Sequence, residues 1–536
     1  MTDHQTAQKI IDTIPLRYRG PGGAIAVVKD GEVIAQRVWG YADVDKRIPF
    51  TAEMQMPICS ISKQFFCALL LDLKRNPTPA MLAKGDIEAQ FTEKLREVLH
   101  PDLTRDSGIT LENLVDMQSG LRDYWAMTAL WGTKPDDEFL VARDCPPMLD
   151  RTKSFHFKPG TEYSYCNVNF HVVARVIERV TGEPLDKLLQ ERVLGPAGMK
   201  TAYLGPDNSK LPAPCVGYEG TEATGFIPAV NLMEWSGDAG IVASLTDMIA
   251  WEKHLDRLYA ESDSWYRQVS KPNTFADGNP AFYHYGLIRR AYDGIQTLGH
   301  AGALPGFRSA RSHAMEDRLS VVVFFNYEPD MVAAAEDVMM ALLNKPKKEY
   351  SPVEPDPAWV GNYLDQETQL SITVSKGSAT GEISVSYDSG PETLKLTDPS
   401  HAEAPGLYAS IDGDIFRMHR IAENRKLEAR GITPRDSSFL DTSLQGDYKS
   451  EEVESVFHCT GEAGMLYGAF DGYLGNSSFT GMVYLGDDVW RLTCPRGLDS
   501  PAPGDWTMVF HRDESGAIIG FKIGCWLARG IDYVKV

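Results

Sequence analysis

The segment M-P-I-C-S-I-S-K-Q-F-F-C-A-L-L, residues 56–70, places Ser60 three positions before Lys63 at the start of an apolar run. Positions i and i+3 share one face of a helix, so the lysine amino group can lie beside the serine hydroxyl. The positive end of a helix and a site out of water both favour a neutral lysine, which could take the serine proton. An N-cap serine followed by a surface lysine fits the same residues, and the segment alone permits both interpretations.

Two later motifs carry further candidate groups. P-G-T-E-Y-S-Y-C-N-V-N-F, residues 159–170, places Tyr165 and Asn167 between a turn and an expected helix. L-G-H-A-G-A-L-P-G-F-R, residues 298–308, places His300 at the end of an expected strand, two residues before a glycine that lets another backbone approach. Each residue alone also fits an ordinary structural role, so only the order and spacing of the three motifs are specific.

Together, S-x-x-K, Y-x-N and H-x-G resemble the serine β-lactamase and penicillin-binding-protein family, whose members carry S-x-x-K, Y-x-N or S-x-N, and K/H-T-G. The resemblance covers about residues 15–335, and D-M-Q-S-G-L-R-D-Y at 116–124 departs slightly from the family's usual H-T-S-G-L. The G-x-S-x-G signature of α/β-hydrolases does not occur in the chain.

The resemblance narrows to the bacterial D-aminopeptidase branch of that family. It rests on P-I-C-S-I-S-K-Q-F, Q-S-G-L-R-D-Y-W-A, Y-S-Y-C-N, G-H-A-G-A-L-P-G and, near the C-terminus, G-C-W-L-A-R-G. It implies a homodimeric hydrolase, without cofactor or metal, that removes N-terminal D-residues, preferably D-Ala, D-Ser or D-Thr, from peptides, amides and esters. It also implies inhibition by some β-lactam compounds.

The resemblance also implies a role for each candidate side chain. Ser60 is the expected nucleophile and Lys63 its base. Tyr165 would relay a proton to the leaving amine, Asn167 would orient Lys63, and His300 would support the Tyr165 hydroxyl electrostatically. Ser62, the second hydroxyl of the motif, has no lysine three residues later and is rejected as nucleophile.

Two further expectations concern substrate contacts. By family analogy, the backbone N–H groups of Ser60 and Ala303 would form the oxyanion hole. The resemblance also gives a loop of the last β domain, P-R-G-L-D-S-P-A-P-G-D at 495–505, access to the active site and makes Asp499 a substrate contact. The alternative is a solvated hairpin with a surface aspartate.

The texture of the chain changes near residue 345. Before it, strands and helices mix, with a hairpin turning at Asp30-Gly31 and an apolar central strand at 318–327. A charged, proline-rich linker at 344–357 follows, and beyond it short alternating strands recur. A weak repeat, G-x-Y at Gly361 and Gly446, divides this second region near T-P-R-D-S at 433–437.

These features predict an α+β chain of three domains. A serine β-lactamase-like catalytic domain, 1–345, has an antiparallel sheet flanked by helices and a helical subdomain. Two small antiparallel β-barrel domains, 346–436 and 437–536, follow it, and the second carries the loop that reaches the active site.

Composition limits the partners. A net charge of −21 and a pI near 5.0 argue against nucleic acid and anionic membranes. The first residues lack a signal-peptide pattern, no stretch reaches about 18 apolar residues, and the eight cysteines include no C-x-x-C pair. The twelve histidines show no ligand spacing, so we expect no metal and a cytoplasmic protein.

Three alternatives stay open from the sequence. An enzyme of the same fold could act as a D,D-carboxypeptidase or an esterase, although the histidine in the K-T-G position slightly disfavours a substrate carboxylate. A catalytically silent scaffold is the second alternative. The third, a carbohydrate-binding module attached to a hydrolase, fits the β domains less well if their loop enters the cleft.

Overall fold

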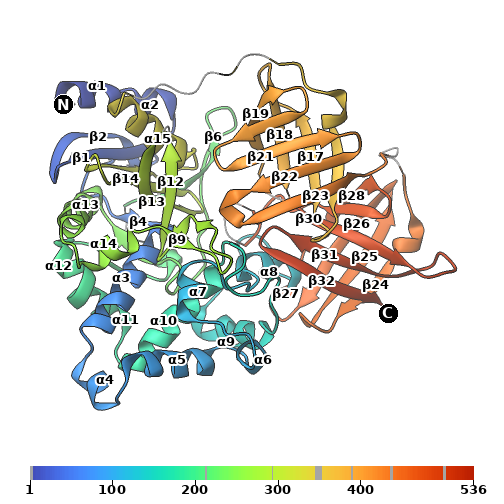
Figure 1. Cartoon of the computed structure of the whole chain (residues 1–536), viewed down its shortest axis with the longest axis horizontal. Coiled ribbons are helices and arrows are strands. Elements are labelled where there is room, and N and C mark those ends of the chain that lie inside the picture. Colours follow the sequence, from blue (N-terminus) through green and yellow to red (C-terminus); the bar gives the residue numbers. More distant parts are fainter. Residues whose placement is uncertain are drawn as a thin grey trace.

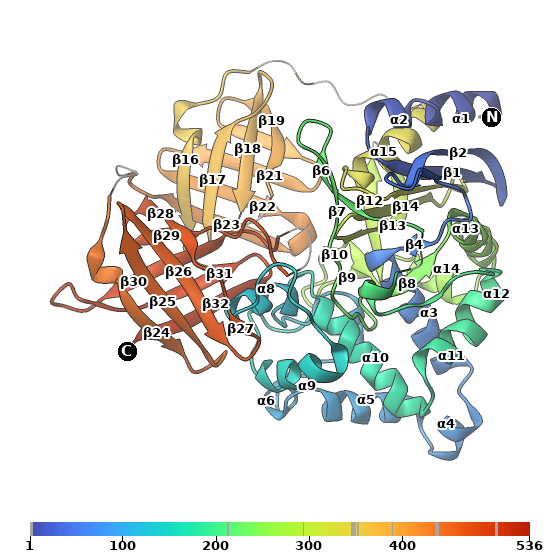
Figure 2. The same ribbon diagram turned by 180° about the vertical axis from the view of Figure 1, so that it is seen from behind.

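The computed structural model describes residues 4–211, 214–292, 294–344, 350, 353–387, 390–434, 439–498 and 502–536. A part built of helices around one sheet contains the N-terminus, and two β-barrels packed against each other and against that part complete the molecule (Figures 1 and 2). In the described parts of the chain, no helix is both long enough and apolar enough to cross a membrane.

One antiparallel sheet forms the frame of the first part, in the order β11-β12-β13-β14-β15-β1-β2-β3. β15 (Leu319–Phe325), the predicted central strand, pairs with β14 (Phe307–Ala314) and β1 (Gly22–Lys29), and its side chains are buried on both faces. The other strands are β2 (Glu32–Asp43), β3 (Ile48–Pro49), β11 (Tyr283–His284), β12 (Leu287–Tyr292) and β13 (Ile295–Leu304). A strand covered on both sides has no polar face, which explains the unbroken apolar run.

The predicted first hairpin is confirmed. β1 and β2 are joined by Asp30 and Gly31, whose φ angles are 52° and 76°. Positive φ at both central residues is the type I′ geometry that matches the twist of the flanking strands.

Helices cover both faces of the sheet. α1 (His4–Ile11) and α15 (Met331–Leu342) pack on one face, and α13 (Leu245–Ala260) packs on the other. Beyond α13 lies α3 (Ser62–Arg75), which also contacts α10 (Asn167–Thr181) of the helical subdomain. The subdomain further contains α4 (Pro79–Ala83), α5 (Ile87–Val98), α6 (Pro101–Thr104), α7 (Leu111–Val115), α8 (Tyr124–Leu130), α9 (Val141–Arg151) and α11 (Leu185–Leu189).

Two closed barrels make up the rest, as expected. The first consists of β16 (Gly361–Asp365), β17 (Ser371–Lys376), β18 (Glu382–Tyr387), β19 (Glu392–Asp398), β20 (His401–Ala404), β21 (Leu407–Asp412), β22 (Ile415–Arg420) and β23 (Arg425–Gly431). The second consists of β24 (Gly446–Ser450), β25 (Ser455–Glu462), β26 (Met465–Gly472), β27 (Gly475–Asn476), β28 (Thr480–Gly486), β29 (Val489–Leu492), β30 (Trp506–Arg512), β31 (Ile518–Cys525) and β32 (Ala528–Lys535). Pairing of β25 with β26 closes this ring.

The G-x-Y repeat marks equivalent places in the two barrels. Each triplet begins the first strand, and each tyrosine is buried. The Tyr363 hydroxyl donates to the Trp359 carbonyl oxygen at 3.2 Å, and the Tyr448 hydroxyl donates to the Leu444 carbonyl oxygen at 2.7 Å. Each tyrosine thus ties the first strand of its barrel to the chain segment four residues before it. Half of the predicted linker, 345–349 and 351–352, and residues 435–437 of the predicted boundary lie outside the described residues.

The second barrel docks tightly onto the helical subdomain. The Trp131 indole N–H donates to the Val453 carbonyl oxygen at 3.0 Å. The backbone carbonyl oxygen of Trp131 accepts the N–H of Leu474 at 3.0 Å. Gly132 has a φ of 91°, and a Cβ added there would overlap the carbonyl oxygen of Gly475. Only glycine therefore permits this backbone-to-backbone approach.

We expect Gly132→Ala to lower the thermal midpoint more than Gly182→Ala. Gly182 also has a positive φ, 74°, but an added Cβ there meets nothing within 4 Å. Backbone strain alone costs about 1–2 kcal/mol, whereas Gly132→Ala adds a steric clash between domains. Differential scanning calorimetry of both variants measures this, and equal midpoints would contradict the tight docking.

Candidate active site

Ser60 lies in a tight turn rather than at the cap of a helix. A 3-10 turn, Cys59–Ile61, precedes α3, whose N-cap is Ile61 and whose cap makes no side-chain hydrogen bond. Cys59 adopts the left-handed region with a φ of 54°, a conformation that non-glycine residues rarely take. The N-cap interpretation of Ser60 is therefore wrong. The serine side chain remains half-buried, whereas Ser62 is fully buried and its hydroxyl accepts the N–H of Ile241 at 3.1 Å.

Lys63 is the most constrained side chain of the site. It has no exposed surface, so the surface-lysine interpretation is also wrong. Its Nζ lies 3.0 Å from Ser60 Oγ, 2.8 Å from Asn167 Oδ1 and 2.7 Å from the carbonyl oxygen of Asp238. A buried amine needs such partners, because each polar group left unsatisfied would be costly.

Asn167 is itself held in place by a buried carboxylate. It is the first residue of α10, and both its backbone N–H (2.8 Å) and its side-chain amide (2.9 Å) donate to Asp123. This pairing fixes the amide so that its oxygen faces Lys63. Burial raises the pKa of Asp123 to about 7, against the lowering effect of the hydrogen bonds from Asn167.

A second buried aspartate supports the other side of Lys63. The side chain of Asp238 accepts the Tyr124 hydroxyl at 2.5 Å and the N–H of Ser236 at 3.0 Å, and burial raises its pKa. Sequence reasoning missed Asp123 and Asp238. Asp123 lies within the quoted stretch 116–124, but nothing in the sequence distinguishes a buried aspartate from one at a surface turn.

Tyr165 completes the group around the serine hydroxyl. Burial raises the pKa of Tyr165 well above its usual value, and a hydrogen bond with Ser60 works in the opposite direction. Lys63 Nζ lies 4.9 Å from the centre of the tyrosine ring. Ser60 thus contacts both a lysine amino group and a phenol that stays protonated at neutral pH.

His300 lies next to Tyr165 but has other hydrogen-bond partners. The two ring centres are 6.3 Å apart. His300 Nε2 lies 3.0 Å from the hydroxyl of Tyr283, and its Nδ1 contacts the carbonyl oxygen of Ala301. Burial lowers the pKa of His300 to about 3, so its ring is neutral at physiological pH. Tyr283 is a further site residue that the sequence did not reveal.

Gly302 lets β13 press against the turn that carries Ser60. A Cβ added at this residue would overlap the carbonyl oxygen of Ile58 and would lie 2.8 Å from Cys59 Cβ. In the described pairings, β12 pairs with β13 only as far as Gly299. Beyond that residue, the edge of β13 that β12 leaves open, near Ala303, faces the 3-10 turn. This brings Ser60 and Ala303, the predicted oxyanion-hole residues, onto facing segments.

Asp499 lies outside the described residues, but the preceding part of its loop is described. Arg496 forms ion pairs with Asp136 (2.7 Å) and Glu219 (3.0 Å), both in the first part of the chain, and Leu498 is buried. This segment of the second barrel is therefore attached to the sheet-and-helix part.

The neutral His300 predicts how acid affects stability. An unfolded histidine titrates near 6.5, so the unfolded chain takes up this proton first as the pH falls. Relative to His300→Gln, the unsubstituted protein should lose about 1.4 kcal/mol per pH unit below about 6.5, until the pH nears 3.

Unfolding midpoints of the two proteins between about pH 7 and pH 4 measure this difference. The destabilisation caused by the substitution should shrink as the pH falls. Parallel curves would show that His300 takes up its proton in the folded state.

Comparison with known proteins identifies relatives of both parts of the chain. The family model described as Beta-lactamase matches residues 7–344, and the model described as D-aminopeptidase, domain B, matches residues 352–534. The D-aminopeptidase of Brucella melitensis biotype 2 is 40% identical over 534 residues, covering 100% of this chain and 99% of the relative. The D-aminopeptidase of Brucella canis is 41% identical over 537 residues, with the same coverage.

A solved structure agrees at the level of the fold. The octameric penicillin-binding protein homologue from Pyrococcus abyssi superposes with a TM-score of 0.51 at 19% identity, covering 80% of this chain and 100% of that chain. With full-length relatives at about 40% identity and a buried S-x-x-K lysine beside Tyr165 and Asn167, the chain belongs to the D-aminopeptidase family, whose first domain is of the β-lactamase type.

Proposed function

We propose that this protein is a serine hydrolase that releases N-terminal D-amino acids from peptides, amides and esters through an acyl-enzyme on Ser60. D-Ala, D-Ser and D-Thr are the preferred residues. The observation that carries the proposal is the environment of the Lys63 amino group, which contacts two carbonyl oxygens and the serine hydroxyl. The full-length similarity to D-aminopeptidases supports the substrate class.

The contacts of Lys63 suit a base. A neutral amine has two N–H bonds and one lone pair, whereas an ammonium has three N–H bonds. Asn167 Oδ1 and the Asp238 carbonyl oxygen each accept one N–H, which in the neutral amine leaves the third position of Nζ, the lone pair, for Ser60 Oγ at 3.0 Å. As Ser60 Oγ bonds to the substrate carbonyl carbon, its proton passes to Lys63.

Tyr165 returns a proton to the leaving group. When the C–N bond breaks, the departing amine takes the phenol proton, and Lys63 resupplies it through the cluster around Ser60. In the second half the same groups accept a proton from the water that attacks the acyl carbon. They return it to Ser60 Oγ as its bond to the acyl carbon breaks and the D-amino acid leaves. Neutral His300 orders Tyr283 beside the phenol and supports Tyr165 without adding charge.

Two substrate contacts complete the proposal. The backbone N–H groups of Ser60 and Ala303 receive the oxyanion, and the close packing at Gly302 supports this assignment. Asp499 binds the free ammonium group of the substrate, and the ion pairs that Arg496 forms with the first domain support this assignment.

Further properties come from the family resemblance. We divide the chain into domains 1–345, 346–436 and 437–536. Family models that match 7–344 and 352–534 support the first boundary, and the separate barrels β16–β23 and β24–β32 support the second. We propose a cytoplasmic homodimer that takes small D-amino-acid peptides or amides as substrates and some β-lactam compounds as inhibitors. It needs no cofactor.

Substrate choice tests the function. The protein should release p-nitroaniline from D-alanine p-nitroanilide but not from the L-isomer or the N-acetylated D-compound, because the site needs a free ammonium group. Absorbance of the released nitroaniline measures this. Equal or faster cleavage of the acetylated compound would instead indicate an esterase or a carboxypeptidase-like enzyme, and no turnover of any compound would favour a silent scaffold.

The two serines of the motif give a matched pair of variants. Ser60→Ala should abolish turnover and labelling by a fluorescent β-lactam. Ser62→Ala should keep both, although it leaves the N–H of Ile241 unsatisfied and costs about 1–3 kcal/mol of stability. Gel fluorescence measures labelling, and a labelled Ser60→Ala protein would overturn the assignment of the nucleophile.

A further inference from the structure

The hairpin between β31 and β32 has no role in the chemistry described above, yet it contacts the supports of the site. It contains G-C-W-L-A-R-G, residues 524–530. The carbonyl oxygen of Leu527 accepts the backbone N–H of Asp123 at 3.1 Å, and that of Arg529 accepts Arg122 Nε at 2.9 Å. The last barrel therefore holds the turn whose carboxylate orients Asn167.

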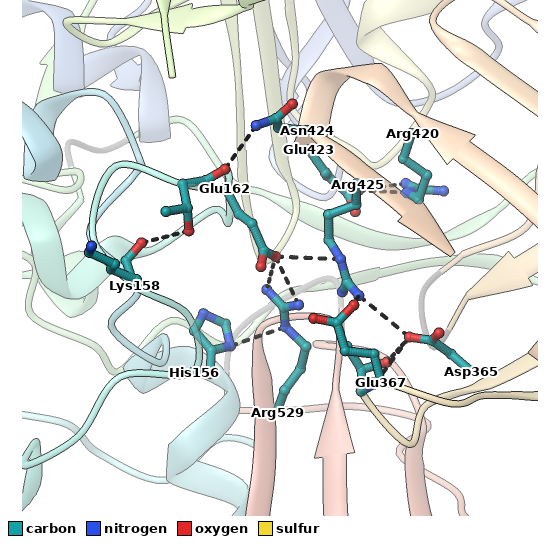
Figure 3. A network of polar contacts seen from close by, with 12 residues as sticks. His156, Lys158, Glu162, Asp365, Glu367, Arg420, Glu423, Asn424, Arg425 and Arg529 are labelled. Carbon is teal, nitrogen blue, oxygen red and sulfur yellow. Dashed lines mark hydrogen bonds and ion pairs between the residues drawn. The ribbon is translucent and has the colours of Figure 1, made fainter. Parts of the chain in front are cut away.

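The side chain of Arg529 reaches a second segment of the site. Both of its terminal nitrogens lie 3.0 Å from Glu162 Oε2, and its Nε donates to His156 Nδ1 at 3.3 Å (Figure 3). Arg529 is only 7% exposed. Removing one partner of an ion pair shielded from water costs far more than breaking an exposed pair, because the other charge is left buried and unpaired.

The first barrel adds another arginine to the same carboxylate. Arg425 Nε lies 3.4 Å from Glu162 Oε2, and the side chain also approaches Asp365 at 3.5 Å (Figure 3). Glu162 thus receives one guanidinium group from each barrel and offsets the repulsion between them. Loss of this carboxylate would leave two buried arginines facing each other.

Glu162 lies three residues before Tyr165, in a segment without regular secondary structure. The backbone N–H of Tyr163 donates to the Glu423 carbonyl oxygen of the first barrel at 3.3 Å, and the N–H of Ser164 donates to the Met117 carbonyl oxygen at 3.0 Å. No helix or sheet fixes residues 162–166, so contacts of this kind help to hold Tyr165 on its N-terminal side. On its other side, the N–H of Cys166 donates to Met117 Sδ at 3.2 Å and Asn167 is bonded to Asp123.

We propose that Arg529 and Glu162 are a positioning pair that fixes Tyr165 against Ser60, so that both barrels act as a frame for the proton-transfer site. Neither residue touches the reacting atoms. The kinetic part of this inference rests on the proposed function, and the structural part stands without it.

Kinetics of matched variants test the proposal. Glu162→Gln keeps the size of the side chain, Arg529→Met removes the charge, and Arg529→Lys keeps it. Misplacement of a catalytic group by about 1 Å can cost about 100-fold, so we expect the first two variants to lower kcat at least about tenfold with KM nearly unchanged. Arg529→Lys should have a higher kcat than Arg529→Met. The kcat of the Glu162→Gln/Arg529→Met double variant should be no lower than that of the less active single variant.

Glu454→Gln is the control. Glu454 lies in the second barrel and forms ion pairs with Lys153 (2.5 Å) and Arg151 (2.9 Å) of the first part, away from the segment that carries Tyr165. Its loss weakens the same domain interface, but kcat should stay within about twofold of the unsubstituted value, as for an exposed pair. An unchanged kcat in Glu162→Gln, or an equal fall in Glu454→Gln, would overturn the proposal.

Hydrogen exchange gives a readout that does not depend on turnover. In Glu162→Gln, the backbone amides of residues 161–167 should exchange faster than in the unsubstituted protein and in Glu454→Gln. If the unsubstituted protein cleaves no D-aminoacyl compound, the proposed function fails, but this comparison still decides the positioning role. Equal exchange of the segment in all three proteins would overturn that role.

Discussion

The Lys63 amino group, buried without any exposed surface, is the constraint around which the site is built. An amine removed from water must satisfy its hydrogen bonds within the protein. Ser60, Asn167 and Asp238 provide them from a 3-10 turn, the first residue of α10 and a loop before β8 (Ile241–Ala243). The contacts of this one nitrogen atom therefore fix α3, which carries Lys63, relative to α10 of the helical subdomain.

The backbone around Ser60 accounts for the partial exposure of this serine, the proposed nucleophile. Cys59 adopts a left-handed conformation, and Gly302 lets β13 press against the turn. These two features expose Ser60 partly while Ser62, two residues away, is buried and bonded to Ile241. One serine is thus available to a substrate and the other is used to hold the fold.

The two barrels form hydrogen bonds and ion pairs with segments of the site. The second barrel bonds directly to Asp123 through the Leu527 carbonyl oxygen, and both barrels meet Glu162 through arginines (Figure 3). A catalytic domain of the β-lactamase type alone would lose these contacts. In this chain the segments around Asp123 and Tyr165 are held by barrel residues that follow hundreds of positions later in the sequence.

The sequence was informative where the chemistry depends on local spacing. The spacing of Ser60 and Lys63 predicted their contact, although the serine lies in a 3-10 turn just before α3 and not on the helix itself. Asp30-Gly31 fits one turn type, and a glycine near His300 indicated a close approach of two backbones. The supports of the site could not be found this way. Asp123, Asp238, Tyr283 and the pair of Glu162 with Arg529 act through tertiary contacts, and an aspartate or arginine in the sequence looks the same whether it is buried or solvated. The contact of His300 with Tyr283 likewise depends on pairing between strands.

The proposed mechanism depends on an acyl-enzyme at Ser60. Acid quenching of the protein within milliseconds of mixing with a D-alanine ester, followed by proteolysis and mass spectrometry, detects this intermediate. We expect the peptide that contains Ser60 to gain the mass of one alanyl group, and the Ser60→Ala protein to gain none. Turnover of the ester with no adduct at any time point, or an adduct on another residue, would exclude an acyl-enzyme on Ser60.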